Sequence, residues 1–259
     1  MHYSPIARDF ATNRELFLPK SVFLETVDEP KPLDCAILHG WHSLFRPLIG
    51  LENALRALPG GHKVRFWRVT YDTHWKSFGQ SALDISGALQ KQGVVPQNTL
   101  LVGYSMGGVV SRAMIAQGFD AAGALCLCSP HFGPAPWLQF GDVGSYSIGV
   151  RSRALAALNA HPTDKKRRGD YFFQAFTYQD RLGKHRHDRI VRERSALGIG
   201  LEGVGMRHSS ELKYAGVAPT CDPHLHGMYP QFLPEALSWC ERKFAAMMLQ
   251  TTSLTPQER

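Results

Sequence analysis

The sequence lacks the features that mark membrane-spanning, secreted and disulfide-stabilised proteins. It contains no apolar run of about 18 residues, the length needed to span a bilayer as a helix. Its first ten residues include no basic segment followed by an apolar stretch, so no secretory signal peptide is predicted and we expect a cytoplasmic protein. Five cysteines in 259 residues, an odd number, do not indicate a disulfide framework.

Two of these cysteines, Cys126 and Cys128, lie two positions apart in an apolar run. On a strand this spacing predicts that both side chains lie on the same face. We interpret them as small buried hydrophobic residues. A redox pair or a metal site is the alternative.

Acidic residues are few between positions 165 and 194, where ten Lys and Arg accompany four Asp and Glu. The whole chain has a formal net charge of +7. A solvated basic face is the simplest interpretation, and attraction to an anionic membrane surface or an acidic substrate is the alternative. Nucleic acid is not an expected partner, because no recognition motif or interleaved aromatic residues accompany the charge.

Internal repeats, low-complexity tracts and linker-like segments are also absent, so residues 1–259 are predicted to form one domain. Strand signals followed by helix signals recur along the chain, which is typical of an α/β fold. Between residues 131 and 169 the periodicity weakens, and we expect a small cap or lid insertion there. The predicted strands are 35–39, 64–71, 98–104, 124–128, 171–177 and 211–217, and the predicted helices are 44–58, 75–91, 107–117, 153–159 and 230–248.

One motif indicates chemistry. Gly103-Tyr-Ser-Met-Gly107 fits the pattern G-x-S-x-G and lies between a predicted strand and a predicted helix. A serine that attacks a carbonyl carbon has to protrude from a very sharp turn with a strained backbone. Glycines on both sides let the strand and helix pass close to the serine, and the helix N-terminus points at the developing oxyanion. The motif therefore predicts that Ser105 is a nucleophile.

Around this serine the sequence resembles the α/β-hydrolase superfamily, in particular the lipase-like branch with bacterial triacylglycerol lipases and GPI-inositol deacylases. Leu38-His-Gly-Trp41 resembles the oxyanion loop of that branch. Ser129-Pro-His-Phe-Gly133 resembles its TPHxG segment, and Arg153–Asn159 resembles its L-x-x-L-N helix. The resemblance extends over about residues 34–237. It implies an α/β-hydrolase fold, with a mostly parallel central sheet and helices on both faces.

The resemblance also implies which groups stabilise the oxyanion. In such enzymes one backbone N–H belongs to the residue after the nucleophile, here Met106. By position, the second belongs to Trp41. His39 is then a structural residue that braces the loop.

The triad acid and base follow the serine in the chain order of this superfamily. Asp188 begins a segment, 188–195, that resembles the family pattern D-x-x-V-P-x-x-S, although Arg192 replaces the proline. We therefore predict Asp188 as the acid, with Asp180 as the alternative.

The base is expected in the loop before the last helix, where His224 and His226 both lie. The spacing to the closing helix favours His224, with His226 as the alternative base and His208 as a more distant third. His185-Arg-His187 and His224-Leu-His226 form two H-x-H pairs, but no H-E-x-x-H or paired C-x-x-C motif accompanies them. We predict neither a metal nor a cofactor.

Together these residues predict a serine hydrolase that cleaves carboxylic esters, an esterase or lipase, through an acyl-serine intermediate. The expected partner is a small-molecule acyl ester, with lipid esters among the candidates. A thioesterase, acyltransferase or amidase on the same fold is the alternative, as is a non-catalytic binding protein that keeps the fold.

Overall fold

The computed structural model describes residues 22–43, 48–135, 141–179, 185–188, 190–212 and 229–253. Its centre is an eight-stranded sheet with the order β1-β3-β2-β4-β5-β6-β7, and β8 pairs with β6. The described strands are β1 (Phe23–Glu25), β2 (Leu33–Leu38), β3 (Val64–Thr70), β4 (Thr99–Tyr104), β5 (Gly123–Leu127), β6 (Tyr171–Gln179), β7 (His185–His187) and β8 (Met206–Leu212).

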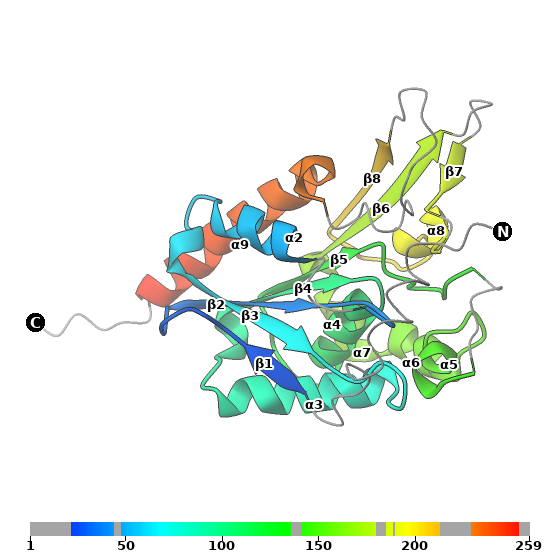
Figure 1. Ribbon diagram of the computed structural model, residues 1–259, viewed down its shortest axis with the longest axis horizontal. Helices are drawn as coiled ribbons and strands as arrows, with labels where there is room; N and C mark the ends of the chain where they lie inside the picture. Colours follow the sequence, from blue (N-terminus) through cyan, green and yellow to red (C-terminus); the bar gives the residue numbers. More distant parts are fainter. Residues whose placement is uncertain are drawn as a thin grey trace, which may run out of the picture.

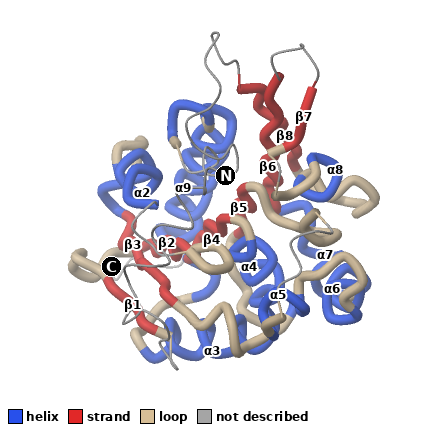
Figure 2. The backbone as a smooth tube through the Cα atoms, turned by 45° about the vertical axis from the view of Figure 1, so that its right-hand side comes forward, coloured by secondary structure: helices blue, strands red, loops and turns tan. Residues whose placement is uncertain are grey.

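Helices cover both faces of this sheet (Figures 1 and 2). On one face α2 and α9 pack, and on the other face α3 and α4 pack. The predicted fold class, an α/β fold with a mostly parallel central sheet, is confirmed. The described α-helices are α2 (Ile49–Arg56), α3 (Phe78–Lys91), α4 (Met106–Ala116), α5 (Val143–Ser147), α6 (Arg153–Ala160), α7 (Pro162–Arg167), α8 (Glu193–Ala196) and α9 (Pro234–Ser253).

The strands in the middle of the sheet are parallel, whereas β1 and β7 run antiparallel to their neighbours. β6 pairs with β8 along one edge, and with β5 and then β7 along the other. The carboxyl ends of β2, β4, β5, β6 and β8 therefore lie at one end of the sheet. In open α/β sheets this is the end where ligands bind.

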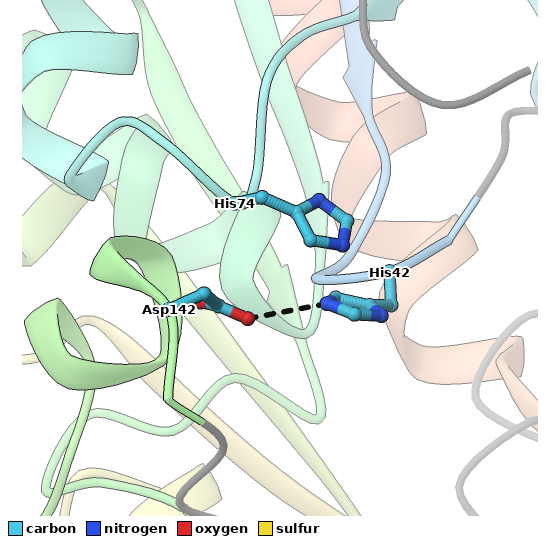
Figure 3. A group of neighbouring side chains, drawn as sticks. All are labelled: His42, His74 and Asp142. Carbon is cyan, nitrogen blue, oxygen red and sulfur yellow. Dashed lines mark hydrogen bonds and ion pairs between the residues drawn. The ribbon is translucent and has the colours of Figure 1, made fainter.

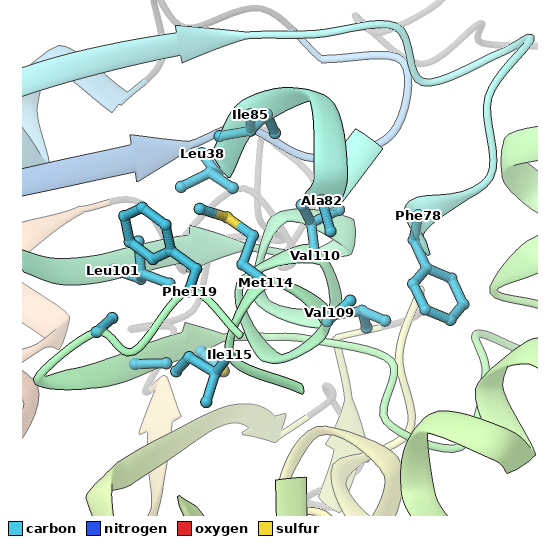
Figure 4. Close-up of a cluster of buried hydrophobic side chains, with 14 of the residues drawn as sticks. Leu38, Phe78, Ala82, Ile85, Leu101, Val109, Val110, Met114, Ile115 and Phe119 are labelled. Carbon is cyan, nitrogen blue, oxygen red and sulfur yellow. The ribbon is translucent and has the colours of Figure 1, made fainter. Parts of the chain in front are cut away.

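The side chains of the central strands alternate between two hydrophobic cores. In β2, Ala36 and Leu38 face the core under α3 and α4, while Cys35 and Ile37 face the core under α2 and α9. Figure 4 shows the first core, built around Met114 on α4. Every residue of α4 is buried, so the helix that follows the predicted nucleophile is held from all sides. Among the described helices, none is long and apolar enough to cross a bilayer.

The two cysteines of β5 correct one expectation. Cys126 and Cys128 are both buried free thiols, but Cys126 faces the core under α4 and Cys128 faces the core under α9. β5 ends at Leu127, and Cys128 adopts a positive φ of 50°. The strand alternation therefore does not extend to Cys128, and the prediction that both side chains share a face is wrong.

Three other boundaries differ from the predicted ones for local reasons. α3 begins at Phe78 rather than near 75, because the Ser77 hydroxyl accepts a hydrogen bond from the N–H of Gln80 and caps the helix. α9 begins at Pro234, after a 3₁₀ turn over Pro230–Phe232. β8 begins at Met206, five residues before the predicted start at 211. The predicted start is late because the first residues of β8 are mainly polar and carry little strand signal.

The segment predicted to form a cap contains α5, α6 and α7; α6 and α7 lie beside α4, and α5 lies beside α6 (Figure 1). The predicted helix 153–159 is found as α6, with the side chain of Ser152 as its N-cap. Whether this segment acts as a cap or lid stays a prediction.

Candidate active site

Ser105 lies between β4 and α4, at the carboxyl end of the sheet. Its backbone has φ 53° and ψ −121°, a region that residues other than glycine rarely occupy. The N–H of Ser105 donates to the carbonyl oxygen of Leu127 at 2.7 Å, which fixes the strained turn to β5. Only 8% of the residue is exposed. The predicted strand–serine–helix turn is therefore present.

The glycines on both sides of Ser105 allow this turn. A Cβ on Gly103 would lie 2.3 Å from the carbonyl carbon of Gly107. A Cβ on Gly107 would lie 2.5 Å from the carbonyl oxygen of Leu38, at the end of β2. Real Cβ atoms do not approach other atoms this closely, so any larger residue would force β4, α4 and β2 apart.

The loop after β2 touches the serine directly. A Cβ on Gly40 would lie 2.9 Å from the Cβ of Ser105, so Gly40 packs against the predicted nucleophile. Trp41 follows Gly40 in this loop. Met106 is the first residue of α4, and its N–H is one of the initial helix donors that have no intrahelical acceptor. The two predicted oxyanion donors thus lie on the two segments that meet at Ser105.

His39 holds the start of this loop. The N–H of Tyr71 donates to its Nε2 at 3.3 Å, so Nδ1 carries the proton and donates to the carbonyl oxygen of Gly40 at 2.7 Å. The Tyr71 hydroxyl donates to the carbonyl oxygen of His39 at 2.7 Å, and the two rings stack with centroids 4.6 Å apart. Burial lowers the pKa of His39 to about 4. A neutral, buried imidazole that bonds backbone groups has the structural role predicted for it.

The lowered pKa of His39 makes stability depend on pH. Its pKa falls from 6.5 to about 4 on folding, so the unfolded chain binds this proton more readily. The contribution of neutral His39 to the unfolding free energy is fully present above pH 6.5. It decreases as the pH falls towards 4, and the loss at pH 4 is about 3 kcal/mol. We expect urea titrations between pH 7 and pH 4 to show a steeper loss of unfolding free energy in the wild type than in His39→Gln. The exposed His62→Gln should behave like the wild type. Equal pH dependence of the wild type and His39→Gln would contradict this assignment.

Asp188 follows β7, which pairs with the last residues of β6. It is only 1% exposed. Its Oδ1 accepts hydrogen bonds from the N–H groups of Ile190 at 3.0 Å and Val191 at 2.6 Å. The carboxylate therefore has a fixed position at the carboxyl end of the sheet.

The rest of this segment binds the loop after β5. The hydroxyl of Ser195 donates to the carbonyl oxygen of Gly133 at 2.9 Å and accepts from the N–H of Phe132 at 3.0 Å. Arg192, which replaces the proline of the family pattern, has φ −63°, a value that proline also adopts. The replacement therefore leaves the local backbone shape unchanged. These contacts place the Asp188 segment beside the loop after β5, and β5 is the strand next to the one that ends at Ser105.

The predicted bases His224 and His226, and the alternative acid Asp180, lie outside the described residues. β8 ends at Leu212 at the same end of the sheet as Ser105, and the described chain resumes at Tyr229 before α9. His208 lies within β8, opposite Gln174 of β6.

The basic stretch after residue 165 does not consist of equivalent solvated charges. Arg168 is buried and pairs with Asp164 at 2.8 Å. Arg167 pairs with Asp120 and with Asp170. Contact with an anionic membrane surface stays a prediction.

Two contacts between Asp142 and the loop after β2 were not predicted from the sequence. Asp142, just before α5, accepts a hydrogen bond from the indole Nε1 of Trp41 at 3.2 Å, and its other oxygen lies 3.2 Å from Nε2 of His42. Asp142 and His42 are 100 positions apart in the chain, so no local pattern indicates this contact.

The fold, though not the sequence, matches known proteins. No protein-family model matches the sequence, and no curated protein matches it. The mature form of the lipase BlEst2 from Bacillus licheniformis superposes with a TM-score of 0.60 and 16% identity, over 90% of this chain and 99% of that one. The propeptide form of that lipase superposes with a TM-score of 0.54 and 17% identity, over 85% of this chain and 53% of that one. A 2,6-dihydroxy-pseudo-oxynicotine hydrolase superposes with a TM-score of 0.50 and 14% identity, over 87% of this chain and 64% of that one. The chain has the α/β-hydrolase fold.

Proposed function

We propose that this protein is a serine hydrolase that cleaves carboxylic esters, with Ser105 as its nucleophile. The observation that carries the proposal is the strained backbone of Ser105, φ 53° and ψ −121°, in a turn that only glycines at positions 103 and 107 permit. Backbone strain of this kind persists where function uses it. The lipase and the hydrolase with the same fold are consistent with this activity.

In the proposed reaction, the Ser105 hydroxyl attacks the carbonyl carbon of the ester while His224 accepts its proton. Asp188 accepts a hydrogen bond from the imidazole and stabilises the imidazolium that forms. The backbone N–H groups of Trp41 and Met106 donate to the oxyanion, which contributes several kcal/mol to catalysis. The imidazolium then protonates the leaving alcohol as the ester bond breaks. Water attacks the acyl-serine by the same steps and releases the acid. His226 stays the alternative base and Asp180 the alternative acid.

A small acyl ester is the proposed substrate, because aromatic side chains lie on two of the loops that follow the carboxyl ends of the parallel strands. Trp41 is partly buried beside Gly40, and Phe132, in the loop after β5, is 37% exposed. An exposed aromatic ring at the ligand end of the sheet offers apolar surface to an acyl chain.

The test is a panel of p-nitrophenyl esters of increasing acyl length, with an acyl thioester and an anilide of the preferred acyl group. We expect hydrolysis of the esters with kcat/KM at least tenfold above the thioester and the anilide. A preference for the thioester or anilide would change the reaction class and keep the nucleophile. No turnover of any member would contradict the proposed function.

Two single variants distinguish the bases. We expect His224→Ala to lose activity about as completely as Ser105→Ala, because the members of a triad act as a unit. His226→Ala should keep activity within about tenfold, which corresponds to about 1.4 kcal/mol of activation free energy. Steady-state kinetics on the preferred ester measure both variants. The reverse ranking would make His226 the base.

A further inference from the structure

Three potential metal ligands come together beside the loop after β2. His42 lies in that loop, His74 follows β3, and Asp142 precedes α5. One ligand atom from each residue lies within 4.8 Å of the other two. Figure 3 shows the imidazole of His74 turned towards that of His42, with the Asp142 carboxylate beside them.

We propose that His42, His74 and Asp142 bind one divalent transition-metal ion. Zinc suits this ligand set best, because two imidazole nitrogens and one carboxylate oxygen are ligands that it commonly takes. Nitrogen and oxygen ligands bind zinc at about 2.0–2.2 Å, so small side-chain movements bring atoms at these separations onto one ion. A fourth position remains for water or another ligand.

The carboxylate is already oriented for this role. Oδ2 of Asp142 faces Nε2 of His42 at 3.2 Å. Oδ1 accepts hydrogen bonds from the N–H of Ser145 at 2.7 Å and from the indole of Trp41 at 3.2 Å. One oxygen is thus left towards the imidazoles while the other is fixed by outer partners, the arrangement that orients ligands in metal sites.

The two imidazoles are also held close together. Their ring centroids lie 3.6 Å apart. The loop backbones are fixed, since Asp72 accepts from the N–H of His74 at 2.8 Å and Thr73 accepts from the N–H of His42 at 3.2 Å.

The site joins the loop after β2 to α5. Trp41 is adjacent to His42 and donates its ring N–H to Asp142. A bound ion therefore holds the Trp41 loop against the segment that precedes α5. The metal site itself does not depend on the proposed hydrolase activity, and its test does not use that activity.

Isothermal titration of untagged, chelator-treated protein with zinc chloride tests the site, together with visible absorption after addition of cobalt(II). We expect one saturable zinc site, and cobalt bands typical of nitrogen and oxygen ligands. His74→Gln and Asp142→Asn should weaken zinc binding at least about 100-fold, because even outer-shell changes cost 10–100-fold. Asparagine can still cap α5, so Asp142→Asn should fold.

The exposed His62→Gln, outside the cluster, is the matched control and should bind zinc like the wild type. Zinc should raise the thermal midpoint of the wild type and of His62→Gln by several degrees, and should leave the midpoints of the two cluster variants unchanged. Equal zinc affinity in the wild type and the cluster variants would overturn the proposal, as would the absence of saturable binding in the wild type.

Discussion

Replacing Ser105 with alanine is expected to lower kcat/KM for p-nitrophenyl butyrate by at least about 10,000-fold. Without the hydroxyl no acyl-enzyme can form, and only the catalysis due to the oxyanion donors and substrate binding remains. The unfolding free energy should change by less than about 1 kcal/mol, since the variant removes a single oxygen atom from a residue that is 8% exposed. Steady-state kinetics and urea titration measure the two effects separately.

Ser111→Ala is the matched control for this variant. Ser111 lies on α4, the helix that follows Ser105, and its hydroxyl donates to the carbonyl oxygen of Gly107 at 2.9 Å. Removing it should leave kcat/KM within about tenfold, or about 1.4 kcal/mol. If Ser105→Ala kept an activity similar to that of Ser111→Ala, Ser105 would not be the nucleophile.

The largest effect on stability is expected from Asp164→Asn. Asp164 and Arg112 are both 0% exposed, and their side chains pair at 2.8 Å and 3.1 Å. Arg168 also pairs with Asp164, at 2.8 Å. Removing the carboxylate charge leaves two buried guanidinium groups without their anion, which costs about 3–5 kcal/mol of unfolding free energy. Urea denaturation of the wild type and the variant measures this loss.

A partly exposed ion pair provides the control. Asp84 pairs with Lys76 at 2.7 Å, and both side chains are 28% exposed. Asp84→Asn should cost less than about 1 kcal/mol, because solvent screens a pair that it reaches. Similar losses for Asp164→Asn and Asp84→Asn would show that the buried cluster does not hold α7 against α4 as strongly as its burial indicates.

This cluster also reaches the loop after β5. Arg112 donates to Nδ1 of His131 at 3.0 Å and to the side-chain oxygen of Asn159 at 3.0 Å, and Asn159 donates to the carbonyl oxygen of His131 at 2.8 Å. Burial and the nearby Arg112 hold the pKa of His131 well below its usual value. The histidine and asparagine of the family-like segments thus connect α4, α6 and the loop after β5.

The sequence predicted those parts of the molecule that local pattern determines. The turn at Ser105 is set by neighbouring glycines and by an apolar strand before it, so its position follows from a few adjacent residues. The same holds for β2 and its loop, where a buried strand ends just before His39 and Gly40.

The features that were missed depend on contacts between distant residues. Arg112 and Asp164 are 52 positions apart, and nothing in the neighbourhood of either residue shows that it is buried. Arg168 lies in a run of basic residues that suggests exposure, yet it points inward to the same carboxylate. His42 and Asp142 meet only because the segment before α5 folds against the loop after β2. Pairings of this kind are set by tertiary packing, so no characteristic spacing of residues in the sequence reveals them.

The most direct test of the central claim is covalent labelling of the pure protein by a fluorophosphonate, followed by peptide mass spectrometry. A serine activated by a base attacks the phosphorus atom, expels fluoride and keeps the phosphonyl group. We expect one label per chain, on Ser105, with no label in Ser105→Ala and slow labelling in His224→Ala. A label on another serine, or no label on the wild-type protein, would contradict the account.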